Sequence, residues 1–355
     1  MVKIEEYSPE ELQRACSFTD LIDKLYREID AEYSFEKCVK KPADFPGWQD
    51  KFRRAVIKTL GIDDMLASRS EVVLVKGDPD MAVDRPKFTI EHFYIKSWAD
   101  TLIPVFLAKP KGLKKGQKVP AFVCTHGHGQ GKDFMMRLSV NSNYPNSHWA
   151  ADLAEMGCIT IAMDQWGWME RGFGGLYNFA EGAYAHKLLL LGRTINGLRF
   201  FDAMRQVDYL LTRDDVDPKK IGIGGLSLGG TTATWTAAID PRISMAIVAG
   251  YLNPFKDGII DHNHCSCNYI PGILKLGEMY DLAALIAPRP ACYICGIKDT
   301  TFYIDPARKA FQKVKSAYKL LGKETNCIID ECNLGHDWNG AVAYPFVQKH
   351  FFLKN

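Results

Sequence analysis

The pentapeptide 225–229, Gly-Leu-Ser-Leu-Gly, places a serine between two closely spaced glycines. It follows the apolar run 220–224 and precedes the helix-prone segment 231–238, so Ser227 is expected on a sharp turn between a strand and a helix. Glycines on either side lack Cβ atoms, which lets neighbouring segments pass close to a strained backbone at the serine. The pattern therefore predicts that Ser227 is a nucleophile.

A serine nucleophile needs a base and an orienting carboxylate, expected in the order Ser, Asp, His after later strands of the same sheet. The apolar run 291–296 leads into a polar loop that holds Asp299, and the run 326–330 leads into a loop that holds His336. A neutral imidazole accepts the serine proton near neutral pH, and a carboxylate fixes its tautomer. We predict that His336 is the base and that Asp299 orients it. The alternative carboxylates are Asp305, Asp330 and Glu331.

A loop that stabilises an oxyanion is predicted further upstream. The apolar run 119–124 ends in Thr-His-Gly-His-Gly-Gln-Gly at 125–131. Negative charge on a tetrahedral intermediate is stabilised by preorganised backbone N–H groups, and glycines let the backbone approach closely. We expect one donor to be the amide of His128 and the other the amide of Leu228. The side chains of His126 and His128 are expected to shape the loop rather than to act as bases.

These four segments resemble the α/β-hydrolase superfamily over roughly residues 86 to 355. The runs 126–132, 163–172 and 281–290 are most similar to the branch of dienelactone hydrolases and acetyl xylan esterases. The resemblance implies an α/β-hydrolase fold with a mostly parallel central sheet and helices on both faces. It also implies hydrolysis of small acyl esters, often acetyl groups on sugars, with no metal and no organic cofactor.

The order of the predicted elements divides the chain into two parts. Residues 1–85 form an amino-terminal helical extension and a first edge strand, with helices starting after Ser8 and spanning 48–60. Residues 86–355 form the catalytic domain. The runs 71–75, 88–95 and 102–107 are predicted strands of an antiparallel edge. From residue 119 onward, apolar strands alternate with helical stretches, which is typical of a parallel sheet covered on both faces.

An aromatic insertion at 165–192 interrupts the catalytic domain. Aromatic rings stack on the apolar faces of sugars, so Trp166 and Trp168 are candidate substrate contacts, although packing of the insertion onto the core is the more common role of such rings. Glu170 and Arg171 are expected to pair with each other or with Asp164 for structural reasons.

Overall charge and hydropathy exclude several classes of function. The 355 residues include 44 basic and 42 acidic side chains, a formal net charge of +2, which favours neither nucleic acid nor an anionic membrane. The segment 1–9 lacks the apolar core of a signal peptide, and no apolar run is long enough to span a bilayer. We expect a cytoplasmic protein whose partner is a small ester, and a homo-oligomer is left open.

Ten cysteines raise the question of disulfides and metals. Five fall where a small buried hydrophobe is expected, and without a signal peptide they should stay reduced: Cys124, Cys158, Cys292, Cys295 and Cys327. The run 261–267 also gathers His262, His264, Cys265 and Cys267. Adjacent ligands such as His264 and Cys265 rarely reach one ion, and no second ligand pair completes a zinc motif. The prediction is a loop at the pocket rim, with no metal.

The sequence thus predicts a serine carboxylic-ester hydrolase that acts through an acyl-enzyme on a small ester, most plausibly an acetylated carbohydrate. A peptidase or thioesterase of the same fold, or a catalytically silent hydrolase-fold binding protein, remains as an alternative. A dinucleotide site at 222–227 is excluded because Ser227 stands where that fingerprint needs glycine or alanine.

Overall fold

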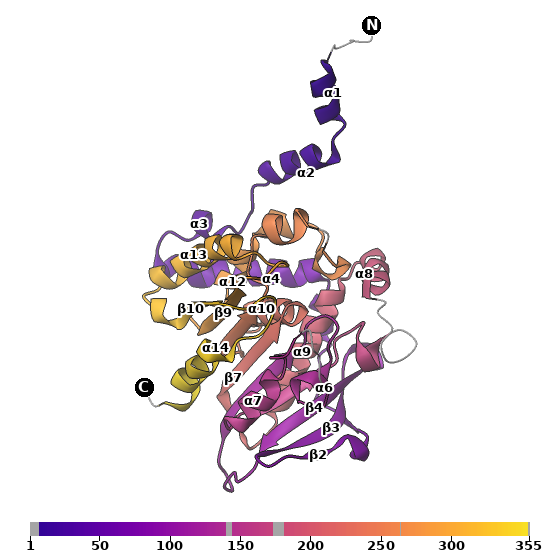
Figure 1. The fold of residues 1–355 in the computed structure, drawn as a ribbon, viewed down its shortest axis with the longest axis vertical. Coiled ribbons are helices and arrows are strands. Elements are labelled where there is room, and N and C mark those ends of the chain that lie inside the picture. Colours follow the sequence, from indigo (N-terminus) through magenta and orange to yellow (C-terminus); the bar gives the residue numbers. More distant parts are fainter. Residues whose placement is uncertain (1–6, 140–143, 173–180, 263, 354–355) are drawn as a thin grey trace.

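A mixed β-sheet forms the centre of the computed structural model, which describes residues 7–139, 144–172, 181–262 and 264–353 (Figure 1). The strands lie in the order β1-β3-β4-β6-β5-β7-β8-β9-β10, with β2 paired to β3. The parallel strands are β5 (Val119–Thr125), β6 (Ile159–Met163), β7 (Val216–Leu226), β8 (Met245–Ala249), β9 (Ala291–Gly296) and β10 (Cys327–Cys332). Their carboxyl ends therefore meet at one edge of the sheet.

The antiparallel edge predicted from the early strands is present. It consists of β1 (Leu74–Lys76), β2 (Val83–Asp84), β3 (Phe88–Lys96) and β4 (Leu102–Pro110). Strand β4 pairs antiparallel with β6 and so joins this edge to the parallel strands. The first strand begins at Leu74, three positions later than the predicted run 71–75.

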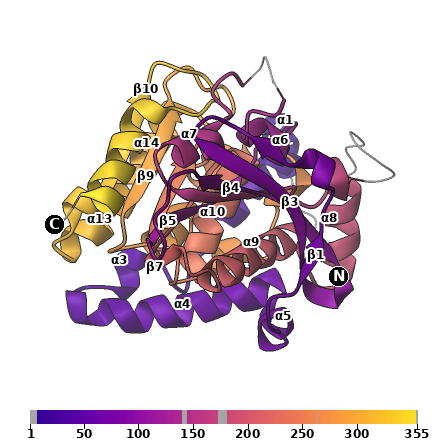
Figure 2. The same cartoon turned by 90° about the horizontal axis from the view of Figure 1, so that it is seen from below.

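Helices cover both faces of the sheet, which confirms the predicted fold class. One face carries α4 (Phe45–Leu60), α9 (Ile195–Leu211), α10 (Leu228–Ile239), α12 (Met279–Ala284) and α13 (Ile304–Leu320). The other carries α6 (Lys132–Met135), α7 (Trp149–Glu155) and α14 (Gly340–Val347). Figure 2 shows α4 and α9 on one side of the strands and α7 on the other. Each face has its own apolar core; Trp235 stacks on Phe200 in one, and Trp149 stacks on Trp338 in the other.

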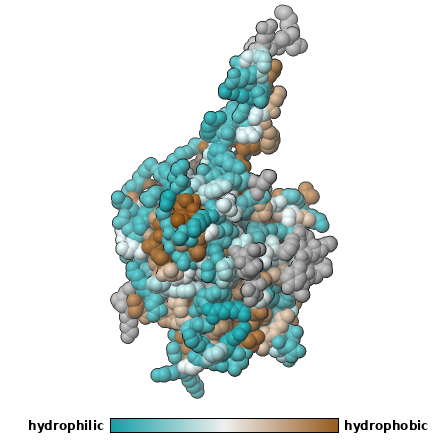
Figure 3. All heavy atoms as spheres, in the orientation of Figure 1, coloured by the Kyte–Doolittle hydropathy of each residue, from teal (hydrophilic) through white to brown (hydrophobic). Residues whose placement is uncertain are grey.

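The predicted amino-terminal helical extension is also present, and its two halves differ. Helices α1 (Pro9–Ala15) and α2 (Phe18–Arg27) project from the body (Figure 1), and neither contains a buried residue. Apolar side chains line one side of this arm in Figure 3. By contrast, α4 buries Phe52, Val56 and Leu60 completely, and the short helices α3 (Phe35–Cys38) and α5 (Asp63–Ala67) flank it in the sequence. The boundary at residues 85 and 86 stays a prediction.

The described cysteines and helices bear on two further expectations. All five cysteines predicted to be buried are buried and free. Cys265 and Cys267, for which the sequence predicts only a loop at the pocket rim, are joined by a disulfide. Among the described residues, none of the helices has both the length and the apolar character needed to cross a bilayer.

Candidate active site

Ser227 lies on the turn between β7 and α10, as the sequence predicts. Its backbone has φ of 59° and ψ of −117°, a conformation that L-residues rarely adopt. The turn is held from two sides: Thr125 Oγ1 donates to the carbonyl of Gly229 at 2.9 Å, and the Ser227 N–H donates to the carbonyl of Ala249 at 2.9 Å. A Cβ atom at Gly225 or Gly229 would overlap with neighbouring backbone atoms, which is why glycine is needed there.

Asp299 and His336 come together from the loops after β9 and β10. His336 Nδ1 lies 2.7 Å from Asp299 Oδ2. The other carboxylate oxygen, Oδ1, accepts the N–H groups of Thr301 at 2.7 Å and Phe302 at 3.0 Å. Two backbone donors therefore fix Oδ1 of the buried carboxylate, and Oδ2 faces the imidazole. This arrangement favours the tautomer of His336 that leaves Nε2 as a proton acceptor.

The imidazole of His336 lies against the chain that leaves β8. A Cβ atom at Gly250 would approach the ring to 2.8 Å, and the ring stacks on Phe302 with centroids 6.0 Å apart. Gly250 directly follows Ala249, whose carbonyl accepts the Ser227 N–H. The imidazole therefore lies beside Gly250, next in the chain to the residue whose carbonyl supports the serine turn.

The three alternative carboxylates are engaged elsewhere. Asp305 and Glu331 both pair with Arg308, at 2.8 and 2.6 Å. Asp330 accepts a hydrogen bond from Asn339 at 2.7 Å. Only Asp299 among these carboxylates contacts His336 in the described contacts.

The predicted oxyanion loop packs against the serine turn. A Cβ atom at Gly127 would lie 3.5 Å from the Cβ of Ser227, and the Gly127 N–H donates to Gln130 Oε1 at 3.2 Å. Because the Gly127 N–H is already hydrogen-bonded to Gln130, it is not available to an oxyanion, and the N–H of His128 stays the predicted donor. Leu228 is the first residue of α10, where backbone N–H groups have no partner within the helix.

Sequence reasoning missed the side chain that braces this loop, Gln165. Its N–H donates to His126 Nε2 at 2.9 Å, its Nε2 donates to the His126 carbonyl at 2.7 Å, and its Oε1 accepts from Thr232 at 2.6 Å. Burial lowers the pKa of His126 to about 4, so the imidazole is neutral and shapes the loop, as expected. The signal for Gln165 was its place two residues after β6, at the carboxyl edge of the sheet.

The acidic and basic residues after β6 pair differently from the prediction. Glu170 and Arg171 contact neither each other nor Asp164 in the described ion pairs. Instead, Lys132 pairs with Asp164 at 2.6 Å and with Glu170, while Arg171 pairs with Asp202 at 2.7 Å. Burial lowers the pKa of Lys132, but the two carboxylates outweigh it and raise the pKa. The partners come from α6 and α9, which local sequence patterns cannot reveal.

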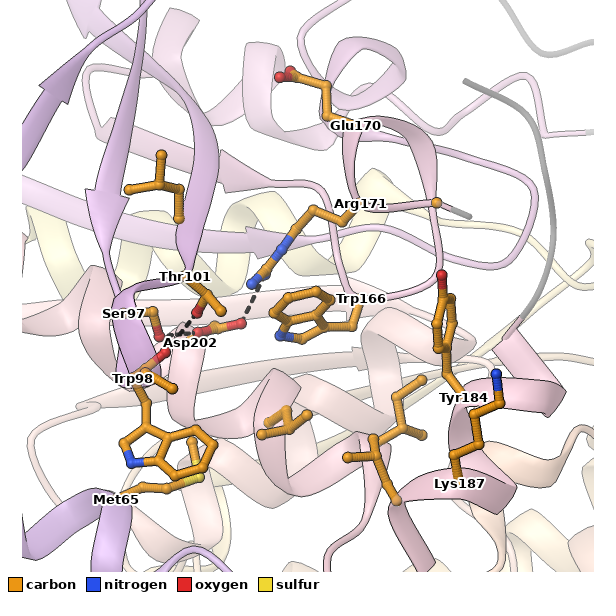
Figure 4. A pocket seen from close by; sticks show the side chains of 16 residues that line it. Met65, Ser97, Trp98, Thr101, Trp166, Glu170, Arg171, Tyr184, Lys187 and Asp202 are labelled. Atoms are coloured by element: carbon orange, nitrogen blue, oxygen red, sulfur yellow. Dashed lines mark hydrogen bonds and ion pairs between the residues drawn. The ribbon is translucent and has the colours of Figure 1, made fainter. Parts of the chain in front are cut away.

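The two predicted tryptophan contacts lie in different environments. Trp166 lines a cavity of about 600 Å³ together with Trp98, Tyr184 and Arg171, and the Arg171 guanidinium lies 3.7 Å from the centroid of the Trp166 ring (Figure 4). Trp168 is 6% exposed and packs edge-to-face against His128. This packing supports the loop, and the predicted contact between Trp168 and substrate stays a prediction. The residues 173–180 of the predicted insertion lie outside the described residues.

This cavity does not contain the candidate catalytic residues. Its lining residues Trp166, Tyr184 and Ile195 belong to a small apolar cluster that also includes Leu228. Part of the cavity lining therefore packs in the same apolar cluster as Leu228, the residue that follows Ser227.

Comparison with known proteins identifies the family. The model of the Abhydrolase family matches residues 7–331. A candidate hydrolase, YtaP from Bacillus subtilis (strain 168), is 29% identical over 257 residues, which cover 69% of this chain and 83% of YtaP.

Two solved structures have a similar fold. A candidate acetyl xylan esterase from Bacteroides fragilis NCTC 9343 has a TM-score of 0.74 at 20% identity, covering 89% of this chain and 82% of that one. A glucuronoyl esterase from Solibacter usitatus has a TM-score of 0.63 at 13% identity, covering 91% and 98%. At these identities the structural likeness supports the fold, whereas the family model extends over most of the sequence, including Ser227 and Asp299. The chain therefore belongs to the Abhydrolase family, the α/β-hydrolases.

Proposed function

We propose that this protein is a serine carboxylic-ester hydrolase that acts on small acyl esters through an acyl-enzyme. The observation that carries the proposal is the 2.7 Å contact between His336 and Asp299, in a structure that also holds Ser227 at φ of 59° on the strand-to-helix turn. These groups have the residue types and chain order of a nucleophile, a base and an orienting carboxylate.

In the proposed mechanism, Ser227 Oγ attacks the ester carbonyl while His336 Nε2 accepts its proton. The backbone N–H groups of His128 and Leu228 stabilise the negative charge that develops on the carbonyl oxygen. His336 then returns the proton to the leaving alcohol, and Asp299 stabilises the imidazolium. Water repeats the sequence on the acyl-enzyme, which releases the acid and restores Ser227.

We further propose that the ester is carried by a carbohydrate, with an acetyl group as the acyl half. The aromatic cavity at Trp98 and Trp166 supports this proposal because aromatic rings stack on the apolar faces of sugars. The catalytic candidates do not line the cavity, although Leu228 packs with part of its lining, so we propose that it binds sugar units remote from the ester. The structural relatives named above as xylan and glucuronoyl esterases also favour a carbohydrate ester.

The decisive experiment compares Ser227→Ala with the wild type. We expect hydrolysis of p-nitrophenyl acetate to fall by roughly 10⁴-fold or more, because the nucleophile is lost, and labelling by a fluorophosphonate probe to disappear. Ser244→Ala is the matched control. Ser244 precedes the first residue of β8 and donates to the Ile221 carbonyl, whereas the Ser227 N–H contacts Ala249 at the last residue of that strand. Undiminished turnover by Ser227→Ala would remove the assignment.

The substrate is tested with the wild type. Initial rates are measured on acetylated xylo-oligosaccharides, on p-nitrophenyl esters of increasing chain length, and on acyl-CoA and acyl-peptide substrates. The proposal expects the highest kcat/KM on the acetylated sugars. A clear preference for acyl-CoA or acyl-peptides would replace it with a thioesterase or a peptidase.

A further inference from the structure

Four potential metal ligands converge behind the predicted oxyanion loop: His128, Glu181, Cys265 and Cys267. One ligand atom from each lies within 4.8 Å of those from all the others. His128 Nε2 lies 3.1 Å from Glu181 Oε2 and 3.8 Å from Cys267 Sγ. Their elements are distant in the sequence, because His128 follows β5, Glu181 begins α8 (Glu181–Leu190), and the cysteines lie in the loop after β8.

The four ligand atoms are of types that can bind one metal ion together. Two sulfurs, one imidazole nitrogen and one carboxylate oxygen are the ligand types that Zn²⁺ prefers in four-coordinate sites. With bonds of 2.0–2.3 Å, tetrahedral ligand atoms are separated by about 3.3–3.8 Å. The widest separation in the cluster would need to contract by about 1 Å, and the two sulfurs, which are bonded to each other in this structure, would need to move apart once reduced.

The surrounding charges and hydrogen bonds also fit a metal site. Two thiolates, one carboxylate and a neutral imidazole around a dication carry a net charge of −1. The buried guanidinium of Arg199 lies 2.6 Å from Glu181 Oε1 and would neutralise that charge. The amide Nδ2 of Asn268 lies 3.3 Å from Cys265 Sγ and 3.6 Å from Cys267 Sγ, where it can donate to both sulfurs.

The disulfide between Cys265 and Cys267 is the competing state of the same four residues. A phosphine reductant and water would convert it into two thiols and a phosphine oxide. A divalent ion that binds the reduced pair would then displace the two thiol protons into solvent. The ligands that complete the site, His128 and Glu181, are far from Cys265 and Cys267 in the sequence, so local spacing does not reveal them.

We propose that, in the reduced protein, His128, Glu181, Cys265 and Cys267 bind one Zn²⁺ ion. The ion joins the loop after β5, the start of α8 and the loop after β8 into one unit. It lies behind the loop whose amide is the predicted oxyanion donor, so its role is to position that loop. The proposal concerns metal binding and does not depend on the proposed esterase activity.

The test uses Co²⁺ as a spectroscopic probe on the full chain. The protein is reduced with a phosphine, stripped with a chelator and titrated first with Co²⁺ and then with Zn²⁺. We expect one Co²⁺ per chain, with a thiolate-to-cobalt charge-transfer band that Zn²⁺ abolishes. Protein oxidised with diamide should show no such band.

Variants locate the site. The double variant Cys265→Ser/Cys267→Ser should lose the band, and Glu181→Gln should raise the Kd for Co²⁺ at least tenfold. The matched control is Cys16→Ser/Cys38→Ser, which removes the two exposed cysteines and should leave the titration unchanged. If the double variant fails to fold, Cys265→Ser alone gives the same comparison. The proposal is overturned if reduced wild type shows no band, if the oxidised protein binds equally, or if the band survives loss of the cysteines.

Discussion

Asp299 and Glu278 are both buried carboxylates that accept two or more backbone N–H groups, yet their remaining neighbours differ. Asp299 accepts Thr301 and Phe302 and turns its second oxygen to His336. Glu278, at the start of α12, accepts the N–H groups of Phe255 and Met279, with Tyr26 Oη at 3.4 Å. Both oxygens of Glu278 accept backbone N–H groups, whereas one oxygen of Asp299 is left for the imidazole, and this difference separates a candidate orienting carboxylate from a structural one.

The setting of Glu278 has an electrostatic consequence. Burial raises the pKa of Glu278 to about 7, and the backbone donors only partly offset this effect. The neighbouring acid Asp281 accepts the N–H groups of Phe35 and Glu278, and burial raises its pKa to about 6. This pair holds the junction between the amino-terminal helices and the body without a cationic partner in the described ion pairs.

Among the changes that test this comparison of carboxylates, Asp299→Asn has the largest expected effect. The asparagine oxygen can still accept the N–H groups of Thr301 and Phe302, so the midpoint of thermal unfolding should stay within a few degrees of the wild type. Its amide group, however, would face His336 Nδ1 and favour the wrong tautomer. We expect kcat for p-nitrophenyl acetate to fall by roughly 10³–10⁴-fold. Steady-state kinetics and thermal unfolding measure the two quantities.

Asp330→Asn and Glu331→Gln are the controls for that prediction. Their hydrogen bonds run to Asn339 and Arg308, away from the imidazole. Both should retain kcat within a few fold. If either lost as much activity as Asp299→Asn, the orienting role would have to be reassigned.

Local patterns were enough to place the catalytic candidates, because each follows a strand of the same parallel sheet. Ser227, Asp299 and His336 follow β7, β9 and β10, whose carboxyl ends share one edge. The alternation of predicted strands and helices also indicated that helices cover both faces of the sheet. Both predictions rest on residues that are close together in the sequence, within one strand and the turn that follows it.

Side chains that meet only through tertiary packing were beyond the same reasoning. The partners Lys132 and Glu170 are 38 positions apart, and Glu278 and Tyr26 are 252 apart. No periodicity connects such positions. Burial of Trp168 was equally hidden, because an aromatic residue in an insertion can face either solvent or the core.

A smaller effect, on stability alone, is expected from Glu278→Gln. Because the folded pKa of about 7 lies above the unfolded value near 4.5, the wild type loses stability as pH rises from about 5 through 7. The loss amounts to roughly 3 kcal/mol above pH 8, because a difference of one pKa unit corresponds to about 1.4 kcal/mol. A neutral glutamine does not titrate, so its unfolding free energy should vary less over this range.

Urea unfolding of both proteins at several pH values measures this difference. Glu324→Gln changes an exposed glutamate and serves as the control. Kcat at neutral pH should be unchanged in Glu278→Gln after correction for folded protein. Identical pH profiles for the wild type and Glu278→Gln would show that the glutamate is not held in its neutral form.

The smallest effect is expected from removing residues 1–25. Helices α1 and α2 contain no buried residue, and the arm removed contributes an ion pair between Asp23 and Lys256 that is partly exposed to solvent. Such pairs contribute about 0–1 kcal/mol, so the unfolding free energy should change by no more than that.

Removing residues 1–38 should instead cost about 3 kcal/mol or more. This deletion takes away Phe35, which is buried against Phe45 and Trp48, and whose N–H binds the Asp281 carboxylate. Urea unfolding of the two truncated proteins therefore divides the amino-terminal region at its junction with the body. Equal destabilisation by both deletions would mean that the projecting arm, rather than the contact between Phe35 and Asp281, stabilises this junction.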